Sequence, residues 1–119
     1  GSNGERRVPL ANFFALPTEE RRTENTLGSD ELIVSLRLPT PASGTRSTYL
    51  KAMDRKVWAF ALVGVAAVIR MDGAAIADAR VVLGGVANIP WRVEAAEQAL
   101  IGNAPSDDLV TRVADTALS

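Results

Sequence analysis

Hydrophobic and polar residues alternate strictly over residues 32–38, LIVSLRL, and Pro39 ends the pattern. Alternation with a period of two is typical of a half-buried strand, so a first strand is predicted here. One face would carry Leu32, Val34, Leu36 and Leu38. The opposite face would carry Ser35, Arg37 and the apolar Ile33. Ile33 is either an ordinary exposed side chain or a sign that this face meets something apolar.

A second strand is predicted over residues 47–53, after a loop rich in Pro, Ser and Gly. Tyr49, Lys51 and Met53 would share one of its faces. The charged residues 54–56 interrupt this pattern.

Residues 61–71 are apolar on both faces. Periodicity cannot separate a buried strand from a helix here, but the β-branched content and the following Asp72-Gly73 favour a strand that enters a hairpin. The return strand is predicted over residues 76–83. It ends at Gly84-Gly85, and paired glycines at a strand end indicate a bulge or a close approach of another backbone.

Two helices are predicted after the strands. The first would begin at residues 90–92, since proline suits the first helical position, and would end near Gly102. Ser106 would cap the second helix, with acidic residues in its first turn. The expected apolar stripes are Val93, Ala96 and Leu100 on the first helix and Leu109, Val110, Val113, Ala114 and Ala117 on the second.

Strands followed by helices indicate an α+β fold, with an antiparallel β-sheet packed against two C-terminal helices. Gly1-Ser2 is interpreted as a cloning remnant. Residues 3–28 are expected to form an irregular N-terminal lead-in, and residues 29–119 a single α+β domain.

Composition narrows the possible functions. The chain has 119 residues, a net charge of −1, and neither cysteine nor histidine. This net charge gives no indication of a nucleic-acid-binding surface. Without histidine and cysteine, the chain lacks the usual general base, thiol chemistry and the commonest metal ligands. No catalytic or metal-binding residue and no glycine-rich phosphate loop is identified. The apolar run 59–69 is too short to span a bilayer, so no membrane association is expected. Trp58 and Trp91 could stack on a planar ligand or anchor a core or an interface.

Several short segments form an ordered set: ENTL at 24–27, DELI at 30–33, LRLP at 36–39, YLK at 49–51, WAFALV at 58–63, ARVVLGGVA at 79–87 and PWR at 90–92. Together they resemble the C-terminal domain of the FAD-binding, medium subunit of molybdenum hydroxylases. That family includes carbon monoxide dehydrogenase, xanthine dehydrogenase and aldehyde oxidoreductases. The resemblance implies that this chain has the fold of that C-terminal domain.

The resemblance implies an assisting role in FAD binding and subunit assembly, within a path that carries electrons to FAD. The molybdenum cofactor and the [2Fe-2S] clusters would lie in partner subunits, and FAD would be shared with an upstream FAD-binding domain. The glycine-rich flavin-binding region of that domain is missing from this sequence, so the chain alone is expected to be inactive. A cytoplasmic location is implied, or a periplasmic one.

The resemblance also implies two cofactor-binding residues, Ile33 and Lys51, which would contact the flavin. An ordinary solvated strand lysine remains open as the alternative for Lys51. The alternative for the whole chain is a non-catalytic protein-interaction domain that does not bind FAD.

Overall fold

The computed structural model describes residues 4–118, so the expected cloning remnant lies outside the described residues. The chain divides into two units, one reaching Thr40 and one starting at Pro41. Each unit is described by itself. The first contains the short helix α1 (Leu10–Phe13) and an isolated bridge between Phe14 and Asn25.

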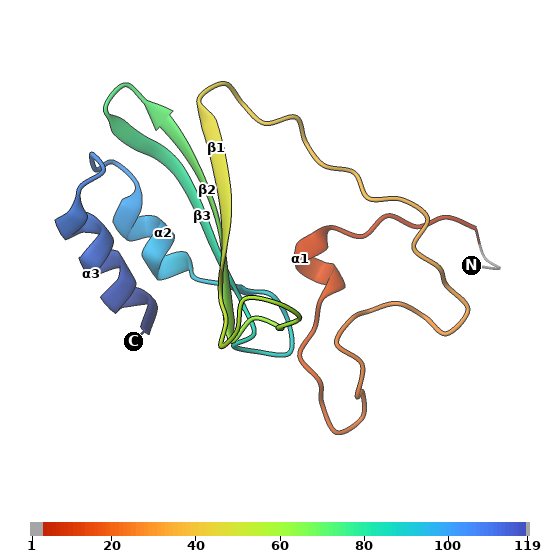
Figure 1. Ribbon diagram of the computed structural model, residues 1–119. Helices are drawn as coiled ribbons and strands as arrows, with labels where there is room; N and C mark the ends of the chain where they lie inside the picture. Colours follow the sequence, from red (N-terminus) through yellow and green to blue (C-terminus); the bar gives the residue numbers. More distant parts are fainter. Residues whose placement is uncertain (1–3, 119) are drawn as a thin grey trace. The chain divides into compact units, whose positions relative to one another are not determined.

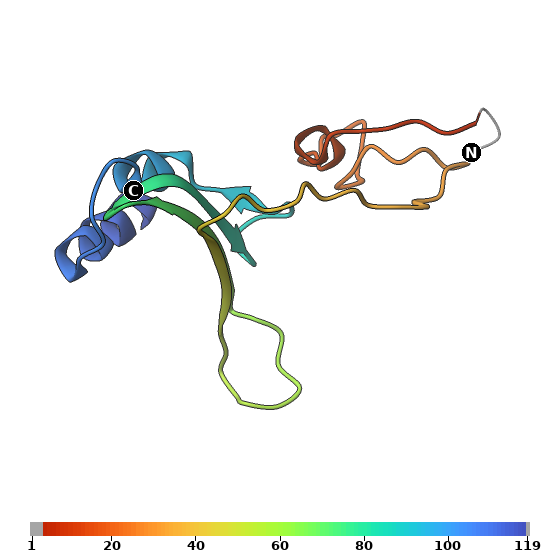
Figure 2. The ribbon, with the colours of Figure 1, turned by 90° about the horizontal axis from the view of Figure 1, so that it is seen from above.

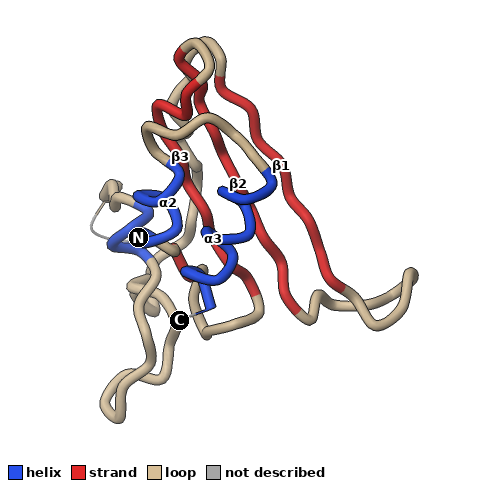
Figure 3. Tube along the Cα trace, turned by 90° about the vertical axis from the view of Figure 1, so that its left-hand side faces the viewer, coloured by secondary structure: helices blue, strands red, loops and turns tan. Residues whose placement is uncertain are grey.

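The second unit contains an antiparallel sheet with the strand order β1-β2-β3-β4. Its elements are β1 (Thr45–Ala52), β2 (Val63–Asp72), β3 (Ala75–Gly84), β4 (Trp91–Arg92), α2 (Glu94–Leu100) and α3 (Asp107–Leu118). Figure 1 and Figure 3 show both α2 and α3 on one face of the sheet. The predicted α+β fold is confirmed, and three of the expected strands correspond to β1, β2 and β3.

The core lies between the sheet and the two helices. Ile76 and Ala79 of β3 are buried with Leu100 of α2 and Leu109 of α3. The partly buried side chains packed around them are Ile69, Met71, Val81, Ile101 and Val113. Ile69 pairs with Ala79 in the β2–β3 ladder, so both side chains point to the helical side of the sheet.

The helix ends follow the sequence signals in part. Ser106 caps α3, because its Oγ accepts a hydrogen bond from the Leu109 amide at 3.2 Å. Gly102 follows α2 with a φ of 82°, in a turn closed by the Asn103 amide on the Leu100 carbonyl. Both caps are therefore confirmed. The outer face of α3 differs from expectation, because Val110 and Ala114 are exposed.

The expected helix start at residues 90–92 is wrong. Trp91 and Arg92 form β4, which pairs with Leu83 and Val82, and α2 begins only at Glu94. The Val93 amide donates to the Val81 carbonyl at 2.9 Å, which extends this contact. The edge of β3 would otherwise present unpaired backbone groups, and satisfying them outweighs the helix-start preference of proline.

The expected strand over residues 32–38 is wrong for the described chain taken by itself. This segment has no regular secondary structure, and its large apolar side chains, from Leu32 to Leu38, are 64–82% exposed. A strand needs a neighbour to satisfy its backbone, and the described chain gives this segment none. Because the units divide after Thr40, the segment belongs to the first unit.

Candidate functional site

Tyr49 and Lys51 lie two residues apart on β1, so their side chains point to the same face of the sheet. Lys51 pairs with Gly64, and Tyr49 pairs with Ala66. The ladder continues across β3 to Gly84 and Val82. These residues alternate with those of the core, so they lie on the side opposite α2 and α3. We call this side, defined by Tyr49, Lys51, Gly64, Ala66, Val82 and Gly84, the open face.

Two glycines, Gly64 and Gly84, lie next to Lys51 in the ladder of the open face. A side-chain carbon at Gly64 would lie 2.5 Å from Oη of Tyr49, so the tyrosine ring occupies the space that any other residue would fill. A hollow of about 370 Å³ lies next to this ring, and Tyr49, Ala66, Val82 and Pro90 are among its lining residues. Around the hollow the open face is therefore mostly apolar, and Lys51 is the cationic residue among those that define it.

Lys51 also holds the β1–β2 loop, residues 53–62, which extends beyond the strands in Figure 2. Nζ of Lys51 donates a hydrogen bond to the Ala59 carbonyl at 3.1 Å. Within the loop, Nη2 of Arg55 donates one to the Trp58 carbonyl at 2.7 Å. An ammonium has three N–H donors, so two remain for a ligand or for solvent.

The β1–β2 loop presents aromatic side chains to solvent. Trp58 is 92% exposed and Phe60 is 98% exposed, and Trp58 has a φ of 55°, which few non-glycine residues adopt. Neither aromatic ring anchors a core within the described chain. Adjacent exposed aromatic residues on a held loop are typical of a surface that another molecule covers.

Gly85 fixes the end of this loop against the sheet. Its φ is 86°, and a side-chain carbon there would lie 2.9 Å from the Leu62 carbonyl oxygen. The close approach expected at Gly84-Gly85 is confirmed at Gly85, and only glycine fits both the φ and the space.

The expected flavin-contacting residues occupy different units. Lys51 lies on the open face of the second unit, whereas Ile33 lies in the irregular segment of the first unit and is 64% exposed. The contact of either residue with a flavin stays a prediction.

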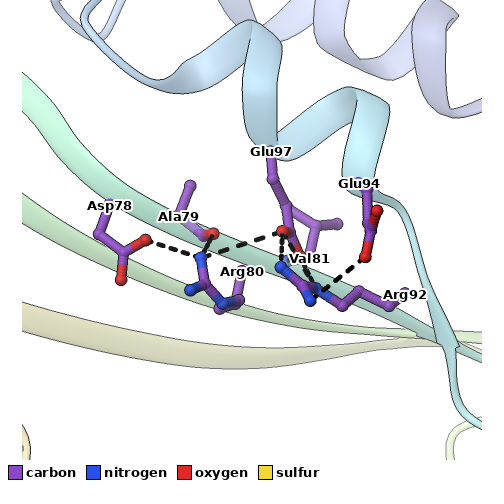
Figure 4. Close-up of polar contacts among 7 residues, drawn as sticks. All are labelled: Asp78, Ala79, Arg80, Val81, Arg92, Glu94 and Glu97. Carbon is purple, nitrogen blue, oxygen red and sulfur yellow. Dashed lines mark hydrogen bonds and ion pairs between the residues drawn. The ribbon is translucent and has the colours of Figure 1, made fainter. Parts of the chain in front are cut away.

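Sequence reasoning missed a buried ion pair at the edge of β3, shown in Figure 4. Glu97 of α2 is only 1% exposed. Its Oε1 accepts hydrogen bonds from the Val81 amide at 3.0 Å and from Arg92 Nε at 2.9 Å, and Arg92 Nη2 donates to Oε2 at 2.5 Å. The hydrogen bonds from Arg92 are the main reason that the pKa of Glu97 is lowered.

The Glu97 carboxylate thus takes the place of a neighbouring strand at Val81, and it joins α2, β3 and β4. A signal was present in the sequence, since position 97 falls on the apolar stripe of α2 between Val93 and Leu100. A charged residue on such a stripe is typical of a buried, paired group. The cluster contains no nucleophile or proton-transfer partner, so we assign it a structural role.

Other kinds of site are not found in the part of the chain that the structure describes. No group of three or more potential metal ligands occurs among residues 4–118. Over the same residues, no helix is both long and apolar enough to cross a membrane.

Comparison with known proteins gives consistent results. The family described as the CO dehydrogenase flavoprotein C-terminal domain matches residues 48–119. The FAD-binding subunit PaoB of an aldehyde oxidoreductase from Escherichia coli K12 is 46% identical over 95 residues, which are 80% of this chain and 28% of PaoB. The carbon monoxide dehydrogenase medium chain of Hydrogenophaga pseudoflava is 34% identical over 100% of this chain and 39% of the relative.

A solved structure extends this likeness to three dimensions. Carbon monoxide dehydrogenase from Hydrogenophaga pseudoflava, in a form lacking the Mo-pyranopterin moiety of its cofactor, superposes with a TM-score of 0.83 at 38% identity. The superposition covers 98% of this chain and 38% of that chain, so the likeness spans well under half of the relative. On the match over residues 48–119, the chain belongs to the family of the CO dehydrogenase flavoprotein C-terminal domain.

Proposed function

We propose that this chain is the C-terminal part of the FAD-binding subunit of a molybdenum hydroxylase, where it assists FAD binding and subunit assembly. The upstream FAD-binding domain would be its immediate partner. Subunits with the molybdenum cofactor and [2Fe-2S] clusters would complete the assembly that passes electrons to FAD. The names of the relatives, an FAD-binding subunit and a medium chain, support this proposal.

The open face fits part of an FAD molecule and not all of it. The open face has a shallow surface where the ring of Tyr49 covers Gly64 and where the neighbouring Gly84 has no side chain. Lys51 adds a cation next to them. A planar ring system suits such a surface. The sequence lacks a glycine-rich phosphate loop, so the pyrophosphate would be held elsewhere.

The observation that carries the proposal is the position of Lys51 beside this shallow surface. FAD, when bound, supplies the redox chemistry. The Lys51 ammonium would hold positive charge next to the ring system, which favours the more negative, reduced form by opposite-charge attraction. Its hydrogen bond to the Ala59 carbonyl would fix the ammonium in place.

The experiment is Lys51→Ala in the complete FAD-binding subunit. The loss of the cation is expected to lower the FAD reduction potential by tens of millivolts, since ~1.4 kcal/mol corresponds to ~30 mV for a two-electron couple. Weaker FAD retention is the other expected result. Spectroelectrochemical titration and flavin content measure both effects, and circular dichroism should show a folded domain.

Two matched variants separate charge from loop anchoring. Lys51→Arg keeps a cation and an N–H donor, so it should restore most of the potential. Lys56→Ala removes the other lysine, in the β1–β2 loop, and should change neither potential nor flavin content. If Lys51→Ala leaves both quantities unchanged, Lys51 is an ordinary exposed strand residue and the assignment is wrong.

The second candidate function is a protein-interaction domain that does not bind FAD. The exposed Trp58 and Phe60 on the β1–β2 loop favour it, because they offer an aromatic contact surface without any cofactor. The flavin content of the purified complete protein distinguishes the two functions. A flavin-free protein that still assembles through Trp58 and Phe60 would support the second.

A further inference from the structure

Residues 32–38 have a strand-like sequence and no strand partner. The hydrogen bonds of the described chain include none made by this segment, and its large apolar side chains are 64–82% exposed. A run of unpaired backbone groups combined with an alternating apolar row is the pattern of a strand that pairs outside its own unit.

The chain just before this segment is well anchored. The Glu31 carboxylate accepts hydrogen bonds from the Gly28 amide at 2.6 Å and from Arg6 Nη2 at 2.6 Å. Arg6 Nη2 also donates to the Thr26 carbonyl at 2.8 Å. The exposed row therefore begins directly after a fixed point, so the missing contacts are a property of residues 32–38 and not of the whole unit.

We propose that residues 32–38 form a β-strand that completes a sheet in the FAD-binding part of the subunit. Leu32, Val34, Leu36 and Leu38 would enter the apolar core of that part, and Ile33, Ser35 and Arg37 would lie on the opposite side of the sheet. This inference rests on the proposed function, because it takes as its partner the FAD-binding part expected upstream.

The comparisons favour this partner. The relatives extend far beyond the match, since this chain covers 28% of PaoB and 39% of the medium chain of Hydrogenophaga pseudoflava. The superposition with the dehydrogenase structure covers 98% of this chain, so the segment lies within the compared region of a much longer chain. A sheet edge in that remainder would satisfy the backbone, and its core would bury the leucine row.

The test compares hydrogen exchange in residues 1–119 alone with exchange in the complete FAD-binding subunit. Amides of residues 32–38 should exchange freely in the isolated chain and at least 100-fold more slowly in the subunit. Free exchange in both proteins would overturn the proposal. Protection in the isolated chain that grows with concentration would overturn it as well, because a second copy would then be the partner.

Adjacent positions on opposite faces provide matched variants. In the complete subunit, Val34→Lys should remove the protection of residues 32–38 and lower the melting temperature by several degrees, whereas Ser35→Lys should do neither. In residues 1–119 alone, both variants should melt like the unchanged chain, since both side chains are exposed. Equal tolerance of the two variants in the subunit would contradict the proposal.

This result is separable from that of the proposed function. If the subunit protects residues 32–38 but contains no FAD, the strand pairing stands and the FAD role fails. If FAD is bound and Lys51→Ala shifts its potential while residues 32–38 exchange freely, the pairing fails alone.

Discussion

At the scale of single residues, Glu97 shows how one buried charge defines a sheet edge. Its carboxylate accepts the hydrogen bond of the Val81 amide, which would otherwise pair with a further strand. Arg92 of β4 neutralises the charge of this carboxylate. A buried carboxylate is costly unless it is both paired and hydrogen-bonded, and here it is both. The cluster contains no buried side-chain polar atom that lacks a partner, within the described chain.

Replacing Glu97 by alanine is expected to destabilise the chain by about 3 kcal/mol, because it leaves the Val81 amide and Arg92 without their partner. Glu97→Gln should cost less, since the amide oxygen can still accept the Val81 hydrogen bond. Urea denaturation followed by circular dichroism measures both. Glu94→Gln is the control: Glu94 also contacts Arg92, at 3.3 Å, but its side chain is 73% exposed, and the expected change is under about 0.5 kcal/mol. Equal effects at positions 94 and 97 would contradict the structural role.

At the scale of elements, local signals predicted what local forces decide. The apolar run before Asp72-Gly73 predicted the β2–β3 hairpin, and Ser106 and Gly102 marked real helix boundaries. The failures came where a distant partner decides. The alternation over 32–38 reports which side chains share a face, but it cannot report whether a neighbouring strand exists.

The start of α2 and the β1–β2 loop illustrate the same limit for the site. Trp91 and Arg92 pair with the edge of β3 as a short strand and do not begin the helix that Pro90 indicates, because the backbone groups of that edge were open to pairing. The position of Lys51 on a strand followed from alternation alone, whereas its hydrogen bond to Ala59 depends on the path of a loop that no local pattern describes. Ile33 and Lys51 could therefore be proposed as flavin contacts from a resemblance, but the sequence could not predict whether they lie close together in space.

The Arg6–Glu31 pair predicts the pH response of the first unit. Hydrogen bonds from Arg6 and from the Gly28 amide lower the pKa of Glu31 from 4.5 to about 2. The pKa of Glu31 in the folded chain lies below its ordinary value. The ionised Glu31 therefore stabilises the first unit fully above about pH 4.5, and this stabilisation is lost as the pH falls towards 2.

The Gly28 amide donates a hydrogen bond to Glu31, so we expect its resonance to shift as the pH falls from about 4.5 towards 2. Two-dimensional NMR at a series of pH values measures this shift. Glu31→Gln should abolish this transition, and Glu19→Gln, in the same unit, should leave it unchanged. A Gly28 resonance that titrates in the Glu31→Gln chain would show that another group is responsible.

At the scale of the whole molecule, the chain spans less than half of the length of its relatives, and we propose that it works as one part of a larger flavoprotein subunit. It belongs to the family of the CO dehydrogenase flavoprotein C-terminal domain, and its 119 residues include no histidine or cysteine. Its distinctive surfaces are the open face, the aromatic β1–β2 loop and the apolar row at 32–38. Exposed apolar surface of this extent is typical of a chain that functions in contact with other parts.

Chemical labelling of the two lysines tests the proposed flavin contact most directly. Lys51 and Lys56 are the only lysines in the sequence, and they lie close together along the chain. Reductive methylation of the complete subunit, read by mass spectrometry with and without bound FAD, compares them in one sample. Slower labelling of Lys51 in the FAD-loaded protein, with Lys56 unchanged, is the predicted result. Equal labelling of Lys51 with and without FAD would contradict the placement of the flavin at the open face.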